Sequence, residues 1–592
     1  MESTPPKEIR MLSRFGACLV CRRRKLRCDA TQPQCNRCRA TGQTCQYQDA
    51  AYRSRIRVLQ DRIKEIEAKI REVEQRRGRS NAPSCVSSSS SNNESVIGSS
   101  ILPEGADHQS SSPASSTNRS LHRQAPDPSP CLDPNILLRR GPSNLSLPGG
   151  ASRKLLSMFL QRKQISGFEL HIGRVVRSFQ PGSSEPAVPA LFNAMLLLGC
   201  HFISEPELQF WENMFYERTK LEIEANIARA HLNDKSKYNP LHHLQAMVML
   251  GQWFYLKGRL LEGHVYVTRA TRFAIALGLH ELDSRIYGHY VATYKEKSHR
   301  GLERWSPRDP IELGEAINLW WSCFLRDYGG TILNGIPPSI SLEEITTVWP
   351  VALSQYEDTG GSNLPNDNYS VPSIFDPDCF HVVMDVSQAT ANCILAKSTI
   401  LTHSAGKLDV ERTSGPEVTD EWWARFEKCD RALERFTQSA RKAYVNRDVE
   451  DVANIALANT AADCAIIQLH APLADFELDM GAQGDPRGLL SENSPGGYSY
   501  VRCMEACRSI ALTTAYIKDI DTSYMQMFFG ISWTCAARVL EKQIPRLSQN
   551  GYMEQVQEME QQLTLIAKNM ERLLLTYPIL ALQAEYIREL LR

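Results

Sequence analysis

Six cysteines near the N-terminus form an internal repeat that constrains this chain more than any other feature of its sequence. The pattern Cys-x2-Cys-x6-Cys occurs twice between residues 18 and 45, and the second copy follows the first at an offset of 17 residues. Thiolates two residues apart can bind one metal ion, and a repeat of such pairs indicates a structural zinc site. The six candidate ligands are Cys18, Cys21, Cys28, Cys35, Cys38 and Cys45.

The number of ligands limits how zinc can be held. Two tetrahedral zinc ions need eight ligand positions, so six thiolates suffice only if two of them bridge both ions. Because the repeat makes its halves equivalent, the bridging pair consists of equivalent cysteines. The three choices are Cys18 with Cys35, Cys21 with Cys38, and Cys28 with Cys45. The alternative is a single zinc that uses the two Cys-x2-Cys pairs and leaves Cys28 and Cys45 spare.

Disulfides are not expected here. The first twenty residues carry charges and lack the apolar core of a secretory signal. Reduced thiols are the rule inside the cell, and the eleven cysteines outside the repeat are dispersed along the chain.

Charge separates the N-terminal region from the rest of the chain. Residues 1–80 carry 20 Lys and Arg against 9 Asp and Glu, whereas the whole chain carries 67 of each. A basic head on a mildly acidic body suits a polyanionic partner. The cations between the second and third cysteines are Arg22, Arg23, Arg24, Lys25 and Arg27. A zinc cage would present them rigidly, which favours nucleic acid over a merely solvated face.

The cysteine spacing, the run CRRRKLRCD and Pro33 between the two halves resemble the binuclear zinc cluster of fungal transcription regulators. The resemblance covers residues 15–48. It implies two zinc ions per chain, bridged by Cys18 and Cys35, and a nuclear protein that binds double-stranded DNA. By the same resemblance Arg24 and Lys25 contact bases of a CGG-type triplet. Arg22 and Arg27 would then contact phosphates.

A heptad pattern follows the cysteine repeat after a short linker. Over residues 52–77 the apolar positions are spaced alternately four and three apart, as in a coiled coil. Arg62 faces Glu67 of a partner helix, and Lys69 faces Glu74, if the two helices are parallel and in register. We therefore expect a short parallel coiled coil that forms a homodimer, with a seam of Tyr52, Ile56, Leu59, Ile63, Ile66, Ile70 and Val73.

Such a dimer predicts a DNA site made of two half-sites. If the coil begins at Tyr52, the six-residue linker spans at most about 20 Å, so the half-sites lie close together. Their relative orientation does not follow from the sequence. An amphipathic helix that packs on the body is the alternative interpretation.

Two stretches have the composition of disordered chain. Residues 78–135 are rich in serine and lack aromatic side chains, so they cannot bury enough apolar surface to fold. We predict a disordered linker there and a disordered tail over residues 1–14.

Residues 136–592 follow the helical period, and strand-like alternation is nearly absent. Residues 241–282 predict a helical hairpin with a turn at Lys257 and Gly258, and a second helix carries Trp320 and Trp321 and ends near Gly335. These two segments resemble the regulatory helical domain, or middle homology region, of the same fungal regulators over about residues 185–345.

Sequence motifs of enzymes are lacking in the body: it has no P-loop, dinucleotide fingerprint, HExxH or nucleophile elbow. Trp320, Trp321, Trp422 and Trp423 could line an effector pocket, but core packing is the favoured interpretation. Buried core positions are likewise favoured for Cys503 and Cys507 over an oxidant sensor. No apolar run approaches the roughly 18–20 residues of a membrane span.

The sequence thus predicts a mostly α protein with a small zinc-organised DNA-binding domain, a short parallel coiled coil, a disordered linker and a large all-helical regulatory domain. The predicted function is sequence-specific regulation of RNA polymerase II genes, exerted through the transcription machinery, without enzyme activity or membrane contact. The alternative is a ligand-sensing receptor whose helical body binds a small-molecule effector and whose zinc head anchors it to DNA.

Overall fold

The computed structural model describes residues 18, 20, 21, 24, 28–31, 33–42, 150–180, 182–231, 238–298, 305–359, 369–414, 418–480 and 496–591. They belong to two compact units that divide after Arg123. The first unit is a small cysteine-centred head, and the second is a helical body. The predicted tail, coiled coil and linker lie outside the described residues.

The described part of the head is organised by its cysteines rather than by an apolar core. Among its described residues, α2 (Asn36–Ala40) is the one helix longer than a single turn. The buried cluster of the head consists of cysteines, with Val20 packed against them. The head therefore has no other described side chains with which to form a core.

The body is built from helices, and no strand occurs among its described residues. Its N-terminal half contains α5 (Ala151–Gln161), α6 (Ile172–Ser178), α7 (Pro189–Phe202), α8 (Pro206–Gln209), α9 (Glu212–His231), α10 (Pro240–Leu256), α11 (Leu260–Ala276), α12 (Tyr287–Ser298) and α13 (Pro310–Asn334). Its C-terminal half contains α16 (Ala391–Ser414), α17 (Asp420–Ala440), α18 (Val449–Met480), α19 (Tyr498–Tyr516), α20 (Phe528–Gln549), α21 (Met553–Thr576) and α22 (Ala581–Glu589).

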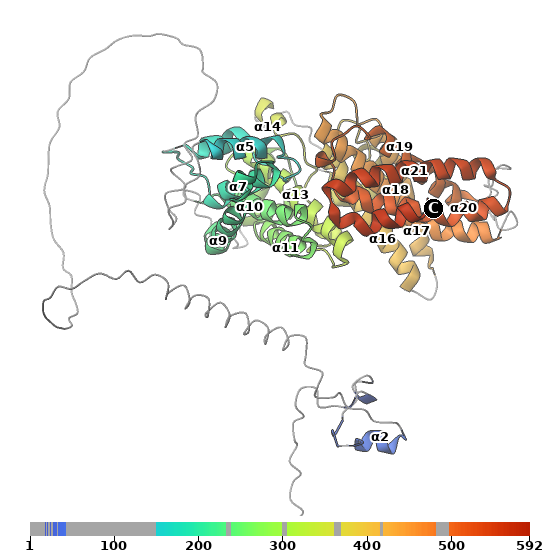
Figure 1. Ribbon diagram of the computed structural model, residues 1–592. Coiled ribbons are helices and arrows are strands. Elements are labelled where there is room, and N and C mark those ends of the chain that lie inside the picture. Colours follow the sequence, from blue (N-terminus) through green and yellow to red (C-terminus); the bar gives the residue numbers. More distant parts are fainter. Residues whose placement is uncertain are drawn as a thin grey trace, which may run out of the picture. The chain divides into compact units, whose positions relative to one another are not determined.

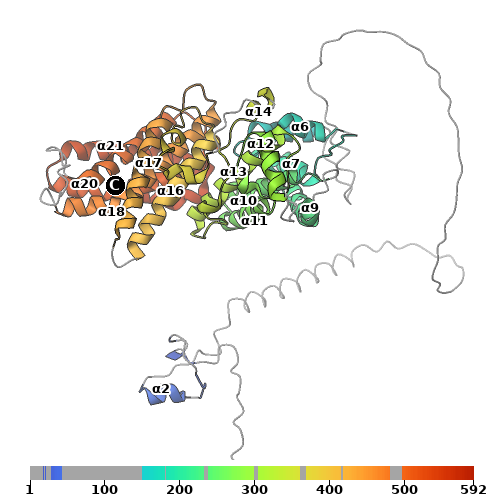
Figure 2. The ribbon, with the colours of Figure 1, turned by 180° about the vertical axis from the view of Figure 1, so that it is seen from behind.

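The two halves of the body lie end to end and share one core. Figure 1 shows the helices up to α13 at one end and those from α16 at the other, and Figure 2 shows the same division from behind. Helices α13 and α16 pack against each other where the halves meet. Most of the buried apolar side chains form one cluster that runs through both halves, and Ala474, Tyr500 and Cys503 form a second, small one. A ligand between the halves would therefore contact both.

The predicted hairpin is present as α10 and α11. Asn239 caps α10 by accepting a hydrogen bond from the Leu241 amide at 2.9 Å, and Pro240 occupies the first helical position. The turn contains Lys257 and Gly258, whose φ of +70° favours glycine. Gly278, at φ +82°, lies after the end of α11, as the sequence predicted.

Gly335 caps the C-terminal end of helix α13, and the aromatic side chains of this helix are buried in the core. Trp321 donates from Nε1 to the Val348 carbonyl at 2.8 Å and stacks on Trp349 with ring centroids 4.7 Å apart. Asp327 accepts from the Ser339 amide at 2.8 Å and so holds the turn that follows the helix. The predicted core role of the tryptophans on this helix agrees with their burial.

The described residues of the segment 355–373 include short helical elements. The segment contains part of the short helix α14 (Ser354–Thr359) and of a 3-10 turn, η3 (Val371–Phe375). Elements this short show no helical period in the sequence. A further one-turn helix, α15 (Phe380–Val383), and the 3-10 turns η1 (Leu279–Glu281), η2 (Leu342–Glu344), η5 (Thr522–Tyr524) and η6 (Pro578–Leu580) complete the described elements.

One apolar helix of the body is as long as a membrane span. Among the described residues, Val449–Leu478 of α18 meets the length and apolarity criteria, and 78% of its apolar window is buried inside the body. Sequence inspection for uninterrupted apolar runs missed it because Asn454, Asn459 and Asp463 interrupt the run. Its burial makes it a core helix.

Candidate DNA-binding zinc centre

Five of the six cysteines of the repeat gather in the described head. The sulfur of Cys18 lies 3.8 Å from that of Cys35 and 3.7 Å from that of Cys38. The sulfur of Cys21 lies 3.8 Å from Cys35 and 4.0 Å from Cys38. Cys28 joins Cys18, Cys21 and Cys35 in a group whose sulfurs all lie within 4.8 Å of one another. Cys45 lies outside the described residues.

These distances fit zinc. A tetrahedral zinc with Zn–S bonds of about 2.3 Å places its sulfur ligands about 3.8 Å apart. All five described cysteines are free thiols and all five are buried, so the sulfurs are gathered without a disulfide. Zinc binds the thiolate form, and buried thiolates this close together would repel one another without a cation between them. The donor set therefore suits zinc.

The two halves of the repeat have the same local hydrogen bond. The Cys21 amide donates to the Cys18 sulfur at 3.4 Å, and the Cys38 amide donates to the Cys35 sulfur at 3.4 Å. In the second half this bond is the N-cap of α2. The sequence repeat is thus a structural repeat in which the first cysteine of each half accepts from the backbone of the second.

Asp29 joins the two halves of the head. Its carboxylate accepts from the Asn36 amide at 3.1 Å and from the Thr31 hydroxyl at 2.5 Å. These contacts, led by the Thr31 hydrogen bond, lower the pKa of Asp29. Asp29, the residue after the third cysteine, therefore holds the start of α2. No sequence pattern predicts this role.

The cations of the head are described in part. Arg24 is exposed, and its amide donates to the Val20 carbonyl at 3.2 Å in the helical turn after Cys21. Arg22, Lys25 and Arg27 lie outside the described residues. Arg37 and Arg39 of α2 are exposed cations that the sequence analysis did not select. The repeat could have identified Arg39, because the offset of 17 residues makes it the counterpart of Arg22.

The dimer seam predicted over residues 52–77 also lies outside the described residues. Nothing in the described head therefore bears on the coiled coil, and it stays a prediction.

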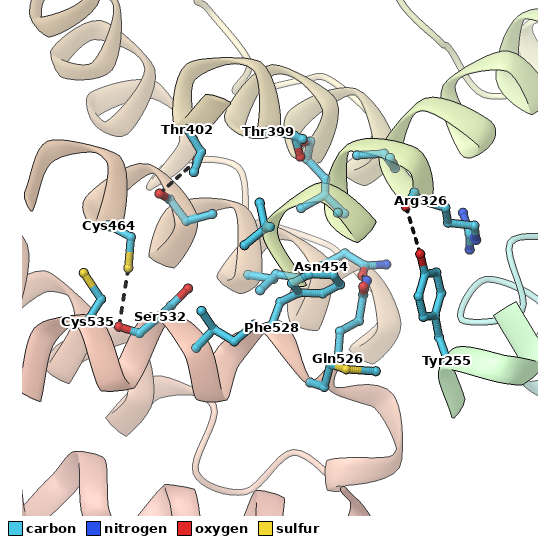
Figure 3. Close-up of a pocket in the computed structure, with 18 of the residues that line it drawn as sticks. Tyr255, Arg326, Thr399, Thr402, Asn454, Cys464, Gln526, Phe528, Ser532 and Cys535 are labelled. Atoms are coloured by element: carbon cyan, nitrogen blue, oxygen red, sulfur yellow. Dashed lines mark hydrogen bonds between the residues drawn. The ribbon is translucent and has the colours of Figure 1, made fainter. Parts of the chain in front are cut away.

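The body contains a cavity of about 440 Å³ that the sequence did not predict. Figure 3 shows part of its lining, contributed by helices of both halves. None of the tryptophans considered as effector-pocket residues lines it. Cys503 and Cys507 are buried, as expected of core cysteines. The lining includes Glu169 and Arg326, which are far apart in the sequence.

Comparison with protein families gives two matches. The description of the first is "Fungal Zn(2)-Cys(6) binuclear cluster domain", and it covers residues 16–54. The second is "Fungal specific transcription factor domain", and it covers residues 157–399. This second match extends beyond residues 185–345 on both sides, so it includes part of α5 and part of α16.

Two curated proteins are similar to parts of the chain. The chain is 24% identical over 357 residues to the depudecin biosynthesis cluster-specific transcription activator DEP6 of Fusarium langsethiae, covering 52% of this chain and 55% of that protein. It is 44% identical over 54 residues to the notoamide biosynthesis cluster transcriptional coactivator notQ' of Aspergillus versicolor, covering 9% of this chain and 10% of that protein. The chain thus matches about half the length of the first relative and a tenth of the second. No solved structure matches the chain.

The two family matches lie in the order in which the sequence placed the zinc head and the helical body, and they describe a transcription factor rather than an enzyme. Zinc binding through the cysteine cluster and DNA binding by the head follow from the first match. The chain thus carries a fungal Zn(2)-Cys(6) binuclear cluster domain followed by a fungal specific transcription factor domain.

Proposed function

We propose that this protein is a nuclear, homodimeric regulator of RNA polymerase II genes that binds paired CGG-type half-sites. The observation that supports the proposal best is the gathering of five cysteine sulfurs at zinc-ligand distances next to the exposed Arg24. The zinc cage would present the cations to DNA, the coiled coil over residues 52–77 would set the register of two heads, and the helical body would control activity through the transcription machinery.

The head would hold two zinc ions, with Cys18 and Cys35 as the bridging ligands. Cys18 and Cys35 both belong to the group of four close sulfurs, and Cys18 also lies 3.7 Å from Cys38. Each of the two accepts an amide hydrogen bond at 3.4 Å, which helps a thiolate that shares its charge between two metals. Elemental analysis of the purified chain should give two zinc ions per chain. A ratio near one would rule out the bridged arrangement.

Base recognition is assigned to Lys25 and Arg24, and phosphate contact to Arg22, Arg27 and, by the repeat, Arg39. Replacing Lys25 with alanine should cost about 1–3 kcal/mol at the preferred sequence and relax base preference. Replacing Arg39 should weaken binding equally at all sequences and flatten the slope of log affinity against log salt by about 0.9. Titrations of labelled duplexes at several salt concentrations distinguish the two effects. If Lys25→Ala kept full base preference, the assignment would be wrong.

Dimerisation is assigned to the heptad seam. Ile63→Lys places a charge at an a position and should yield a monomer by light scattering, with weakened binding to a duplex that carries two half-sites. Binding to a single half-site should change little. Lys64→Gln, at the neighbouring b position, is the matched control and should remain dimeric. A dimer that survives Ile63→Lys would overturn this seam.

The targets are proposed to be genes of a biosynthetic cluster, because the names of both relatives refer to such clusters. Genome-wide occupancy measured together with expression in a deletion strain would test this. Binding sites concentrated beside one set of adjacent, co-regulated genes support the proposal. Sites scattered among unrelated genes contradict it.

A further inference from the structure

The cavity of about 440 Å³ in the body lies where its two halves meet. Helices α10 and α13 of the N-terminal half line one part of it, and α16, α18 and α20 of the C-terminal half line the rest (Figure 3). Cavities that bind small molecules measure roughly 300–1,000 Å³. The size and position of this cavity therefore suit a small molecule that contacts both halves at once.

Most of the cavity wall is apolar. Leu325 and Ile332 of α13 face it from one half, and Leu395, Leu457 and Ile531 face it from the other. Ala461 of α18 also lines the cavity and keeps part of its surface accessible, although it lies in the middle of a core helix. A wall of this kind binds the hydrocarbon part of a ligand.

Arg326 is the one cation among the described residues that line the cavity. In Figure 3, Arg326 and Tyr255 lie on one side of the view, Cys464 and Cys535 on the opposite side, and Phe528 between them. Tyr255 donates to the Arg326 carbonyl at 3.5 Å. The cavity thus places one cation beside a mostly apolar wall, which is the polarity of an amphipathic molecule.

Arg326 has donor capacity left for a ligand. Its Nε donates to Gln252 Oε1 at 3.0 Å, and its Nη1 donates to the carbonyl and the hydroxyl of Ser322 at 3.0 Å and 2.9 Å. A guanidinium has five N–H groups, and within the described chain Nη2 donates to none of its neighbours. Two N–H groups of a cation that lines the cavity therefore lack an acceptor.

Gly167 leaves the space that this guanidinium occupies. A Cβ at position 167 would lie 2.2 Å from Arg326 Nη2, and the φ of Gly167 is +70°. The Gly167 carbonyl also accepts hydrogen bonds from Gln245 at 2.8 Å and Ser322 at 3.2 Å. These hydrogen bonds hold the Gly167 backbone against one side of the Arg326 guanidinium. A side chain at position 167 would not fit there.

The carboxyl group nearest to Arg326 does not neutralise it by contact. Glu169 accepts from Asn392 Nδ2 at 2.9 Å and acts on Arg326 only at longer range. Burial raises the pKa of Glu169 to about 7, so this carboxyl is only partly ionised near neutral pH. The other acidic lining residue, Asp409, forms an ion pair with Arg412 at 2.9 Å. The surroundings of Arg326 in the cavity are therefore positive on balance.

We propose that this cavity binds an amphipathic carboxylic acid, with the carboxylate on Arg326 Nη2 and the hydrocarbon part between Leu395 of one half and Ile332 of the other. A carboxylate is the acceptor that matches a guanidinium. Because the ligand would contact both halves, its binding would favour the arrangement of the halves seen here, which is how an effector shifts a regulatory domain. The assignment does not rest on the proposed DNA sites or on the dimer.

The test is isothermal titration calorimetry on the full chain with decanoate and with decan-1-ol, which has the same chain without the charge. Wild-type protein should bind decanoate. Arg326→Met should weaken decanoate binding at least about tenfold, since a charge-assisted hydrogen bond is lost, and should change the affinity for decan-1-ol less than twofold. Arg447→Met is the matched control, because Arg447 is a half-buried arginine outside the cavity that donates to the Ala389 carbonyl at 2.7 Å. It should leave both affinities unchanged.

Ala461→Met tests the location independently, since the added side chain fills the cavity, and it should weaken both ligands at least about tenfold. Thermal melting of each variant verifies folding, and Ala461→Met decides the matter if Arg326→Met does not fold. The proposal is overturned if wild type does not bind decanoate, if binding survives Ala461→Met, or if the two arginine variants weaken it equally. Cys21→Ser should abolish DNA binding and leave decanoate binding intact, so failure of one proposal is distinguishable from failure of the other.

Discussion

At the scale of single residues, Asp430 on α17 is held by three side chains of the C-terminal half. Its carboxylate lies 2.6 Å from Arg502 Nη2 and 3.1 Å from His470 Nε2, and it accepts from the Tyr498 hydroxyl at 2.7 Å. Burial alone would raise the pKa of Asp430, but His470, Arg502 and Tyr498 hold it well below its usual 3.8. Asp430 is therefore an ionised anchor between α17, α18 and α19.

Asp430→Asn should destabilise the body by about 3–5 kcal/mol, because it leaves the half-buried Arg502 without its partner. Urea unfolding of the full chain, followed by circular dichroism, measures the loss. Since the folded pKa of Asp430 lies below the unfolded one, its contribution is present above pH 3.8 and is lost as the pH falls below that value. The exposed Glu427 on the same helix provides the control: Glu427→Gln should change stability by less than about 0.5 kcal/mol. Equal losses in the two variants would contradict the anchor.

His242 and His243 at the start of α10 make stability depend on pH in a higher range. Burial lowers the pKa of His242 to about 3, helped by Arg308 and Arg174, and that of His243 to about 4. The unfolded chain binds these two protons near pH 6.5, and the folded chain does not. Stability should therefore fall between pH 6.5 and 4, by about 1.4 kcal/mol per pH unit for each histidine. Replacing both with glutamine should make the midpoint of urea unfolding depend less on pH. An unchanged pH dependence would disprove their role.

At the scale of elements, α5 and α7 approach each other at a glycine. A Cβ on Gly199 would lie 2.3 Å from the Leu155 carbonyl oxygen, which is backbone and cannot move aside. Gly199→Ala should thus destabilise the body by about 1–3 kcal/mol. Gly288 in α12 has open space around its Cβ position, so Gly288→Ala should be neutral or slightly stabilising. Thermal melting compares the two, and a neutral Gly199→Ala would show that the helices can separate.

Some elements were predictable from sequence and others were not. The hairpin of α10 and α11 followed from apolar spacing with Gly258 and Gly278 as stops, and α13 followed from its tryptophans and Gly335. The cysteine cluster followed from spacing alone, because zinc geometry fixes which thiols can meet. The cavity did not follow, since Glu169 and Arg326 come to line one cavity only through tertiary packing. Asp29 was missed for a similar reason: its hydrogen bond to Asn36 depends on the folded loop.

At the scale of the whole molecule, head and body have separate cores. The buried cluster of the head consists of cysteines, whereas that of the body is a continuous apolar core. About thirty residues without an apolar core depend on metal to fold. Removing zinc with EDTA should therefore abolish DNA binding and leave the thermal unfolding of the body unchanged. Adding zinc back should restore DNA binding, and a lowered melting temperature of the body would contradict this independence.

The burial of α18 has a consequence for how the protein is made. This helix is covered by α16, which precedes it, and by α19 and α20, which follow it in the chain. A ribosome therefore releases an apolar segment of membrane-span length before the helices that cover one of its sides have been synthesised. Chains that end between residues 481 and 495 would expose that side permanently. They should aggregate or bind chaperones, whereas the complete chain hides the segment as soon as α19 and α20 fold onto it.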